Sequence, residues 1–196
     1  MSKLLIVESP SKAKTISNYL GSEYKVLASY GHIRNLLPKS EGINTKNFEM
    51  NFQLIDRNKK HMDAISKAAK NSEEVLLATD PDREGEAIAW HIAEILNSKK
   101  LIKNKKIARI IFGEVTKNAI IDALQKPREI ASALVHAQQA RQALDYLIGF
   151  NLSPLLWSKI RYGLSAGRVQ SPALRLITER EKEIEKFIKK EYWSIH

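Results

Sequence analysis

Three acidic residues occur at alternate positions, Asp80, Asp82 and Glu84, and only Thr79 separates them from an apolar run that ends at Ala78. Carboxylates this close together repel one another unless a cation neutralises them, and hard oxygen donors of this kind suit Mg²⁺. In proteins with an open α/β sheet, ligands bind at the carboxyl ends of the strands. The pattern therefore predicts a magnesium site at a strand-to-helix turn.

A fourth carboxylate, Glu8, follows the first apolar run of the chain, residues 3–7. If the two runs form neighbouring strands, Glu8 faces the three acidic residues and becomes a further metal ligand. The alternative is that Asp80, Asp82 and Glu84 only cap a helix and complement its dipole. Arg83 does not suit a simple cap, and we expect its guanidinium to contact a phosphate.

Lys12 lies in the first turn of a helix that Ser9 and Pro10 are suited to begin. A cation at a helix N-terminus opposes the dipole, which indicates an anion beside it. A phosphate would then be held by the helix N-terminus and Lys12 on one side and by Mg²⁺ on the other. The alternative is an ordinary exposed lysine.

The elements that must position these residues alternate along residues 1–127. Strands are expected at 3–7, 25–29, 74–79 and 107–112, and helices at 10–20, 58–70, 84–96 and 116–125. We interpret residues 31–52, which contain Gly, Pro and Asn without clear periodicity, as a long loop. The alternation predicts an α/β domain with a mostly parallel four-stranded sheet flanked by helices.

An all-helical segment is expected over residues 128–196. The spacing predicts helices at 130–148, 153–160 and 168–190, followed by a short strand at 192–195.

The excess of basic over acidic side chains is concentrated in the second half of the chain. Residues 1–100 contain 15 basic and 13 acidic side chains, whereas residues 101–196 contain 17 and 9. This local excess favours a nucleic-acid partner over general solubility.

Composition also excludes several classes of protein. The 196 residues include no cysteine, which excludes disulfides and thiolate chemistry. No run approaches 18 apolar residues, and no secretory signal precedes Glu8, so we expect no membrane span and a cytoplasmic location.

Several side chains are candidates for binding a single strand. We expect Arg161, Arg168, Gln170 and Arg175 to line a groove, with the helix start near Arg168 taking a phosphate. Arg175 has an alternative as a solvated helix face. His32 and Arg34, in the loop after the second strand, are further candidates, although a lone histidine is more often structural.

Six longer motifs together resemble bacterial DNA topoisomerase I, a type IA enzyme. They are VESPSKAKTI (7–16), YGHIR (30–34), ATDPDREGEAIAWH (78–91), FGEVTK (112–117), ARQALDYLIGF (140–150) and GLSAGRVQS (163–171). The resemblance covers essentially the whole chain. Its α/β part resembles the TOPRIM domain, which primases, gyrases and some nucleases share.

The resemblance implies an enzyme that cuts one DNA strand through a tyrosine, passes the other strand and reseals the break. Such an enzyme relaxes negatively supercoiled DNA as a monomer on the nucleoid, with Mg²⁺ and without ATP. It also implies that Asp80, Asp82 and Glu84 bind Mg²⁺, that Glu8 transfers a proton at the 3′ oxygen, and that Lys12 stabilises charge on the phosphate. Arg168 would lie beside the DNA path.

One departure from the family pattern concerns the nucleophile. The family's tyrosine lies in a segment resembling YMRTDS, and none of the six tyrosines here has that context. We therefore expect an N-terminal fragment that needs the remainder of the enzyme and is inactive alone. Two alternatives stay open: a stand-alone TOPRIM module that binds nucleic acid, and a TOPRIM nuclease or primase in which metal activates water or a hydroxyl.

Overall fold

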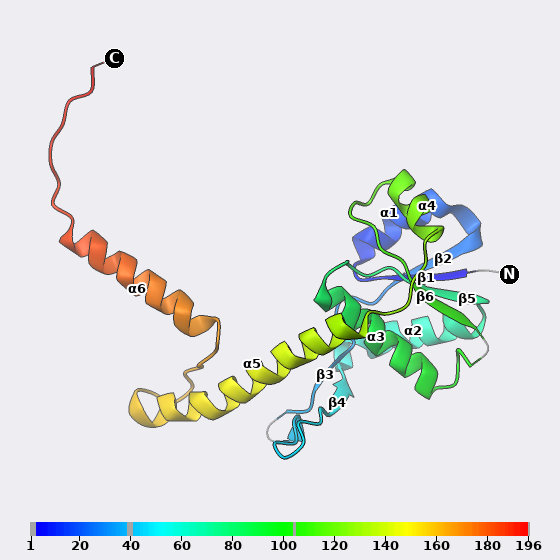
Figure 1. The fold of residues 1–196 in the computed structure, drawn as a ribbon, viewed down its shortest axis with the longest axis horizontal. Helices are drawn as coiled ribbons and strands as arrows, with labels where there is room; N and C mark the ends of the chain where they lie inside the picture. The colour runs from blue at the N-terminus through cyan, green and yellow to red at the C-terminus, as the bar shows by residue number, and fades with distance from the viewer. Residues whose placement is uncertain (1–2, 39–40, 104, 196) are drawn as a thin grey trace. The chain divides into compact units, whose positions relative to one another are not determined.

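The computed structural model describes residues 3–38, 41–103 and 105–195 (Figure 1). The chain forms two compact units, one up to Arg141 and one from Gln142 onward. Among the helices described, none is long and apolar enough to cross a membrane.

A four-stranded parallel sheet forms the centre of the first unit. Its strands lie in the order β2 (Tyr24–Ala28), β1 (Lys3–Val7), β5 (Glu74–Leu77) and β6 (Lys106–Arg109). All three pairings between neighbouring strands are parallel. This confirms the predicted fold class, and it places the first and third expected strands side by side.

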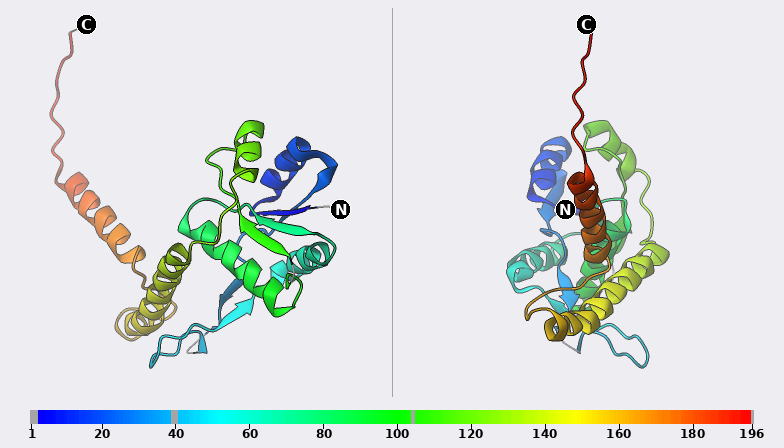
Figure 2. Two further views of the ribbon diagram at one scale, coloured as in Figure 1. Left: turned by 45° about the vertical axis from the view of Figure 1, so that its right-hand side comes forward. Right: turned by 90° about the vertical axis from the view of Figure 1, so that its left-hand side faces the viewer.

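Helices cover both faces of this sheet (Figure 2). The helices α1 (Pro10–Leu20) and α4 (Lys117–Leu124) pack on one face. The helices α2 (Lys59–Lys70) and α3 (Arg83–Ser98) pack on the other. Because consecutive strand residues point to opposite faces, a strand buried on both sides is apolar at every position.

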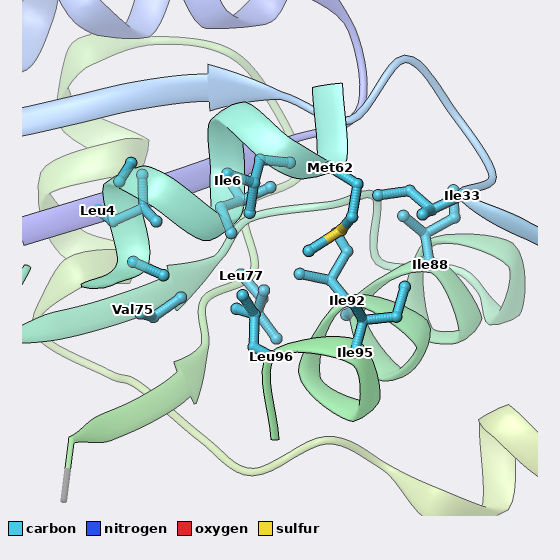
Figure 3. Close-up of a cluster of buried hydrophobic side chains, with 14 residues drawn as sticks. Leu4, Ile6, Ile33, Met62, Val75, Leu77, Ile88, Ile92, Ile95 and Leu96 are labelled. Carbon is cyan, nitrogen blue, oxygen red and sulfur yellow. The ribbon is translucent and has the colours of Figure 1, made fainter. Parts of the chain in front are cut away.

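The hydrophobic core consists of two clusters, one on each face of the sheet, and side chains of β1 contribute to both. Leu4 and Ile6 belong to the cluster under α2 and α3, whereas Leu5 and Val7 belong to the cluster under α1 and α4. Figure 3 shows the first cluster, which gathers side chains from β1, β5, α2 and α3 around Met62. These four β1 side chains are fully buried, and only Lys3 of β1 is exposed, so the packed strand fixes the position of Glu8, which directly follows Val7.

Side-chain caps begin the helices that matter for the site. The Ser9 hydroxyl accepts a hydrogen bond from Lys12 N–H at 3.2 Å, and Pro10 occupies the first helical turn of α1. The Asp82 carboxylate accepts one from Gly85 N–H at 2.8 Å at the start of α3. Both caps satisfy backbone donors that have no partner within the helix.

The expected loop at 31–52 is wrong in part, because it contains strand structure. Strands β3 (Arg34–Leu36) and β4 (Phe52–Leu54) form a separate antiparallel pair, and Ile43 and Met50 form an isolated bridge. The paired segments are short and far apart in sequence, so neither periodicity nor a tight turn reveals them.

Helices account for the regular structure of the chain after residue 131. The expected helices at 130–148 and 153–160 form one helix, α5 (Ser132–Lys159), with Pro154 inside it. A proline removes one helical hydrogen bond without always ending the helix, and here α5 continues. The last helix, α6 (Gln170–Lys186), ends before the expected residue 190.

The strand expected at 192–195 is wrong. Residues 187–195 form neither helix nor strand, and Tyr192, Trp193 and Ile195 are almost fully exposed. Their side chains suit a strand, but a strand needs a partner, and no described segment pairs with them.

Candidate metal and phosphate site

Glu8 and Asp80 meet because β1 and β5 are neighbours. Ala78 N–H donates to Ile6 O at 2.7 Å, which continues the strand pairing to the edge of the sheet. There the Glu8 carboxylate accepts a hydrogen bond from Asp80 N–H at 2.5 Å. The structure thus brings together two acidic residues 72 positions apart, as the strand pattern predicted.

Lys12 is the cation of this cluster. The first turn of α1 directs its Nζ to the Asp80 carboxylate, and the same Nζ lies 4.0 Å from Glu8 Oε1. The ammonium group therefore neutralises charge at the point where the ends of β1 and β5 converge. A lysine held by two carboxylates is not an ordinary exposed lysine.

Burial raises the pKa of the Glu8 carboxyl, and the negative charge of Asp80 also raises it. The Asp80 N–H and the charge of Lys12 act in the opposite direction but do not outweigh these effects. Glu8 therefore retains a proton more readily than an exposed glutamate. This property suits a group that exchanges protons with a nearby oxygen.

The other two acidic residues, Asp82 and Glu84, make different contacts. Asp82 is exposed and caps α3, as the structural alternative for this cluster predicted. Glu84 faces other side chains: its Oε2 lies 3.3 Å from His32 Nε2 and 3.3 Å from Gln138 Nε2. Arg83, between them, is exposed on the first turn of α3.

The donor chemistry of this cluster fits a hard divalent cation, since carboxylate oxygens are the ligands that Mg²⁺ takes. In this structure, however, the side chains are not arranged as ligands of one ion. Among the described residues, no three Asp, Glu or His side chains converge into a metal-binding group. Asp80 is paired with Lys12, and Asp82 with the helix N-terminus. An ion would therefore compete with Lys12 for Asp80.

Arg109, at the end of β6, is a site residue that the sequence analysis missed. Its side chain has no exposed surface. Nη1 donates to the carbonyl oxygen of Thr79 at 2.7 Å, and Nη2 donates to that of Asp80 at 2.6 Å. Arg109 thus holds the backbone from which the acidic residues project. A lone arginine within an apolar strand was the signal that should have identified it.

Glu86 is the buried partner of Arg109, with Nε donating to Glu86 Oε2 at 3.1 Å. Arg128 Nη2 and Ala131 N–H also donate to this carboxylate, at 2.8 and 2.6 Å. Burial alone would raise the pKa of Glu86, but these hydrogen bonds and the charges of both arginines outweigh it and lower the pKa. Glu86 therefore stays ionised and anchors the segment that leads into α5.

Gly85 allows α3 to begin close beneath Asp80. A Cβ at this position would lie 2.2 Å from Asp80 O and 2.7 Å from Asp80 N, distances that no side chain tolerates. The Thr79 hydroxyl, buried next to it, donates to Gly85 O at 2.5 Å. The tight turn that presents the acidic residues therefore requires glycine here.

The DNA-binding candidates of the second unit lie around the start of α6. Arg168 forms a two-pronged ion pair with Asp145, at 2.7 Å from Nε to Oδ1 and 3.2 Å from Nη2 to Oδ2. Gln170 is the first residue of α6, and Arg161 is exposed. Arg175 pairs with Glu179 one turn along α6, which agrees with its alternative as a solvated helix face.

The two candidates from the loop after β2 lie in the first unit. His32 contacts Glu84, which brings it to the acidic cluster. Arg34 lies elsewhere: its Nε donates to His91 Nδ1 at 2.9 Å, and its guanidinium packs over the rings of Phe52 and Trp90. A DNA-binding role for either residue stays a prediction.

Comparison with known families identifies the class of this fold. The Toprim domain model matches residues 3–115, which include the parallel sheet and the whole acidic cluster. The chain belongs to the Toprim family. A second model, described as DNA topoisomerase, matches residues 129–196.

Individual relatives identify the family more narrowly than the domain models do. DNA topoisomerase 1 of Xylella fastidiosa (strain Temecula1) is 65% identical over 194 residues, and that of Rickettsia felis is 57% identical over 196. Both alignments cover 98% of this chain, but the chain spans only about a quarter of each relative (24% and 25%). The resemblance to bacterial DNA topoisomerase I is thereby confirmed.

A solved structure supports the same conclusion. Full-length topoisomerase I from Thermotoga maritima superposes with a TM-score of 0.80 at 46% sequence identity. The match covers 95% of this chain and 31% of that chain.

Proposed function

We propose that this chain supplies the metal and phosphate site of a type IA DNA topoisomerase. The activity would be ATP-independent cleavage of one strand of DNA, passage of the other strand and religation, which relaxes negative supercoils. One observation carries the proposal. Glu8 and Lys12, from the first strand and helix, meet Asp80 at the end of β5, inside a Toprim domain whose relatives are named DNA topoisomerase 1.

The roles follow from the position of each side chain. Glu8, whose pKa is raised by burial, would protonate the 3′ oxygen that leaves when the strand is cut and take the proton back on religation. Lys12 would stabilise negative charge on the attacked phosphate. Arg83, exposed beside the acidic residues, would contact a neighbouring phosphate of the strand.

Asp80, Asp82 and Glu84 would hold Mg²⁺, with Glu8 as a further ligand. The ion would bind phosphate oxygen and offset the charge that accumulates there. The nucleophilic tyrosine would come from a part of the enzyme beyond these residues, since none of the six tyrosines has the expected context. The partners would then be single-stranded and negatively supercoiled DNA and the remainder of a monomeric enzyme on chromosomal DNA in the cytoplasm.

A magnesium titration of this chain tests the metal assignment. The informative variant is Asp82→Asn, because asparagine caps a helix as well as aspartate does and so separates metal binding from folding. We expect Asp82→Asn to weaken Mg²⁺ binding measured by calorimetry. The matched control is Asp122→Asn on the exposed face of α4, which should leave binding unchanged. Equal binding by wild type and Asp82→Asn would remove Asp82 from the site.

Two DNA assays test the activity itself. A longer chain that includes the remainder of the enzyme should relax negatively supercoiled plasmid with Mg²⁺ and without ATP. The present chain, incubated with Mg²⁺ and single-stranded DNA, should bind without cutting. Cut strands from this chain alone would instead show a Toprim nuclease. A longer chain that binds DNA yet never relaxes it would show a binding module.

A further inference from the structure

We propose that Gln138, on α5, is a positioning residue for the metal site: it holds the Glu84 carboxylate and offers an acceptor to a water bound to the ion. This inference rests on the proposed function and deepens it. It assigns to the site a residue outside the acidic cluster. It also links the segment that matches the DNA topoisomerase model to a carboxylate of the Toprim domain.

The first observation is the contact itself. Gln138 Nε2 donates to Glu84 Oε2 at 3.3 Å, from a residue that is only 5% exposed. His32 Nε2 lies 3.3 Å from the same oxygen. Two groups from different elements therefore hold one oxygen of Glu84. This arrangement restricts the rotation of the carboxylate and occupies Oε2, so Oε1 is the oxygen that would bind an ion.

The second observation is an unpartnered atom. Gln138 Oε1 is buried, and no described residue donates a hydrogen bond to it. Leaving a buried acceptor without a partner is destabilising, so such atoms are rare unless something else satisfies them. Only the amide NH₂ can donate to a carboxylate, so the orientation of this side chain is fixed and Oε1 must be the free acceptor.

A water bound to Mg²⁺ would satisfy this atom. Mg²⁺ keeps several of its waters when proteins bind it, and those waters donate strongly to nearby acceptors. Groups that orient carboxylate ligands and metal-bound waters typically change metal affinity by 10- to 100-fold. Gln138 carries both features of such a group: a donor to a ligand and an acceptor beside it.

The first test compares Gln138→Met with Gln139→Met in this 196-residue chain. Methionine keeps the length and helix propensity of glutamine but removes both hydrogen-bonding groups. We expect Gln138→Met to weaken Mg²⁺ binding about tenfold by calorimetry. The control at Gln139, the next residue of α5, should bind Mg²⁺ as wild type does. Wild-type affinity in Gln138→Met would overturn the inference.

A second variant covers the case in which Gln138→Met does not fold. Gln138→Glu keeps the size of the side chain and places a negative charge against Glu84, so the two carboxylates repel each other without metal. The melting temperature in chelator should then fall, and saturating Mg²⁺ should raise it by several degrees more than in wild type. A rise equal to or smaller than that of wild type would contradict a position beside the ion.

Separate results would contradict the Mg²⁺ site and the role of Gln138. If wild-type protein binds no Mg²⁺, the proposed metal site fails and this inference with it. If wild type binds Mg²⁺, Asp82→Asn weakens it and Gln138→Met does not, only the role of Gln138 is overturned.

Discussion

The Nη2 atom of Arg109 lies 2.6 Å from the carbonyl oxygen of Asp80, and the whole arginine side chain is shielded from solvent. Its other nitrogen, Nη1, reaches the carbonyl oxygens of Leu77 and Thr79, at 3.1 and 2.7 Å. One guanidinium group thus bonds to the main chain at three positions, from the end of β5 to the first acidic residue. Arg109 therefore holds the main chain at Thr79 and Asp80 through their carbonyl oxygens, while the Asp80 carboxylate pairs with Lys12.

Replacing Arg109 with methionine should therefore destabilise the first unit strongly. Glu86 would keep Arg128 but lose its fully buried partner, and breaking a buried ion pair from one side costs about 3–5 kcal/mol. For a unit of this size the melting temperature should fall by about 10 °C. The control is Lys99→Met, which breaks the exposed pair with Asp63 and should change the melting temperature little. Equal effects of the two variants would contradict a supporting role for Arg109.

Gly85→Ala should destabilise the protein although alanine favours helices. Propensity alone predicts a gain of about 1 kcal/mol, but the new Cβ would lie 2.2 Å from a backbone oxygen that Arg109 holds in place. The clash must displace Asp80 or the start of α3, at a cost of about 1–3 kcal/mol. Chemical denaturation measures the loss, and a magnesium titration should show weaker binding.

The matched control for this change is Gly149→Ala, inside α5. There the added Cβ would meet Ala166 O at 3.7 Å, an ordinary contact. Alanine should be neutral or stabilising at that position. If Gly85→Ala also proved neutral or stabilising, the tight packing of α3 beneath Asp80 would not be required.

The neutral state of His91 should make stability depend on pH. The pKa of His91 falls from its ordinary value of 6.5 to about 3, mainly because of burial and to a smaller extent because of Arg34 and the nearby His32. Phe52 packs against the ring, and Arg34 Nε donates to its Nδ1. The unfolded chain binds a proton here more readily than the folded chain does.

This contribution is therefore complete above pH 6.5 and is lost as the pH falls from 6.5 toward 3. Thermal unfolding at pH 7 and pH 5 should show a loss in wild type. The loss should shrink in His91→Gln, which keeps an acceptor for Arg34 but does not titrate. His136→Gln, on the exposed face of α5, should behave like wild type. An identical loss in His91→Gln would exclude His91 as its origin.

Much of the fold and part of the site followed from local pattern. The strand ending at Val7 and the strand ending at Leu77 were recognisable because fully buried strands are apolar without interruption, and their carboxyl ends had to share one edge of the sheet. The meeting of Glu8 with Asp80 is a direct consequence. Lys12 was recognisable because a cation in the first helical turn opposes the helix dipole.

The missed features depend on distant partners. An arginine inside an apolar strand marks Arg109 as unusual in the sequence, but only the tertiary structure shows that it donates to the carbonyl oxygen of Thr79 and pairs with Glu86. Gln138 has no distinctive neighbours in sequence, because its contact with Glu84 spans 54 residues. The expected strand at 192–195 failed for the same reason: side-chain type suited a strand, but pairing is a property of two segments.

Single-stranded DNA should bind the second unit through Arg168. Its pair with Asp145 is exposed, so exchanging that carboxylate for a phosphate costs little. Removing one cation that neutralises a phosphate flattens the slope of log K against log salt concentration by about 0.7 for single strands. Arg168→Ala should therefore weaken binding of a fluorescent oligonucleotide and flatten its salt dependence by about that amount. Arg180→Ala, which breaks an exposed pair with Glu183, serves as the control and should alter neither. Binding by Arg168→Ala with an unchanged slope would exclude a phosphate contact at this residue.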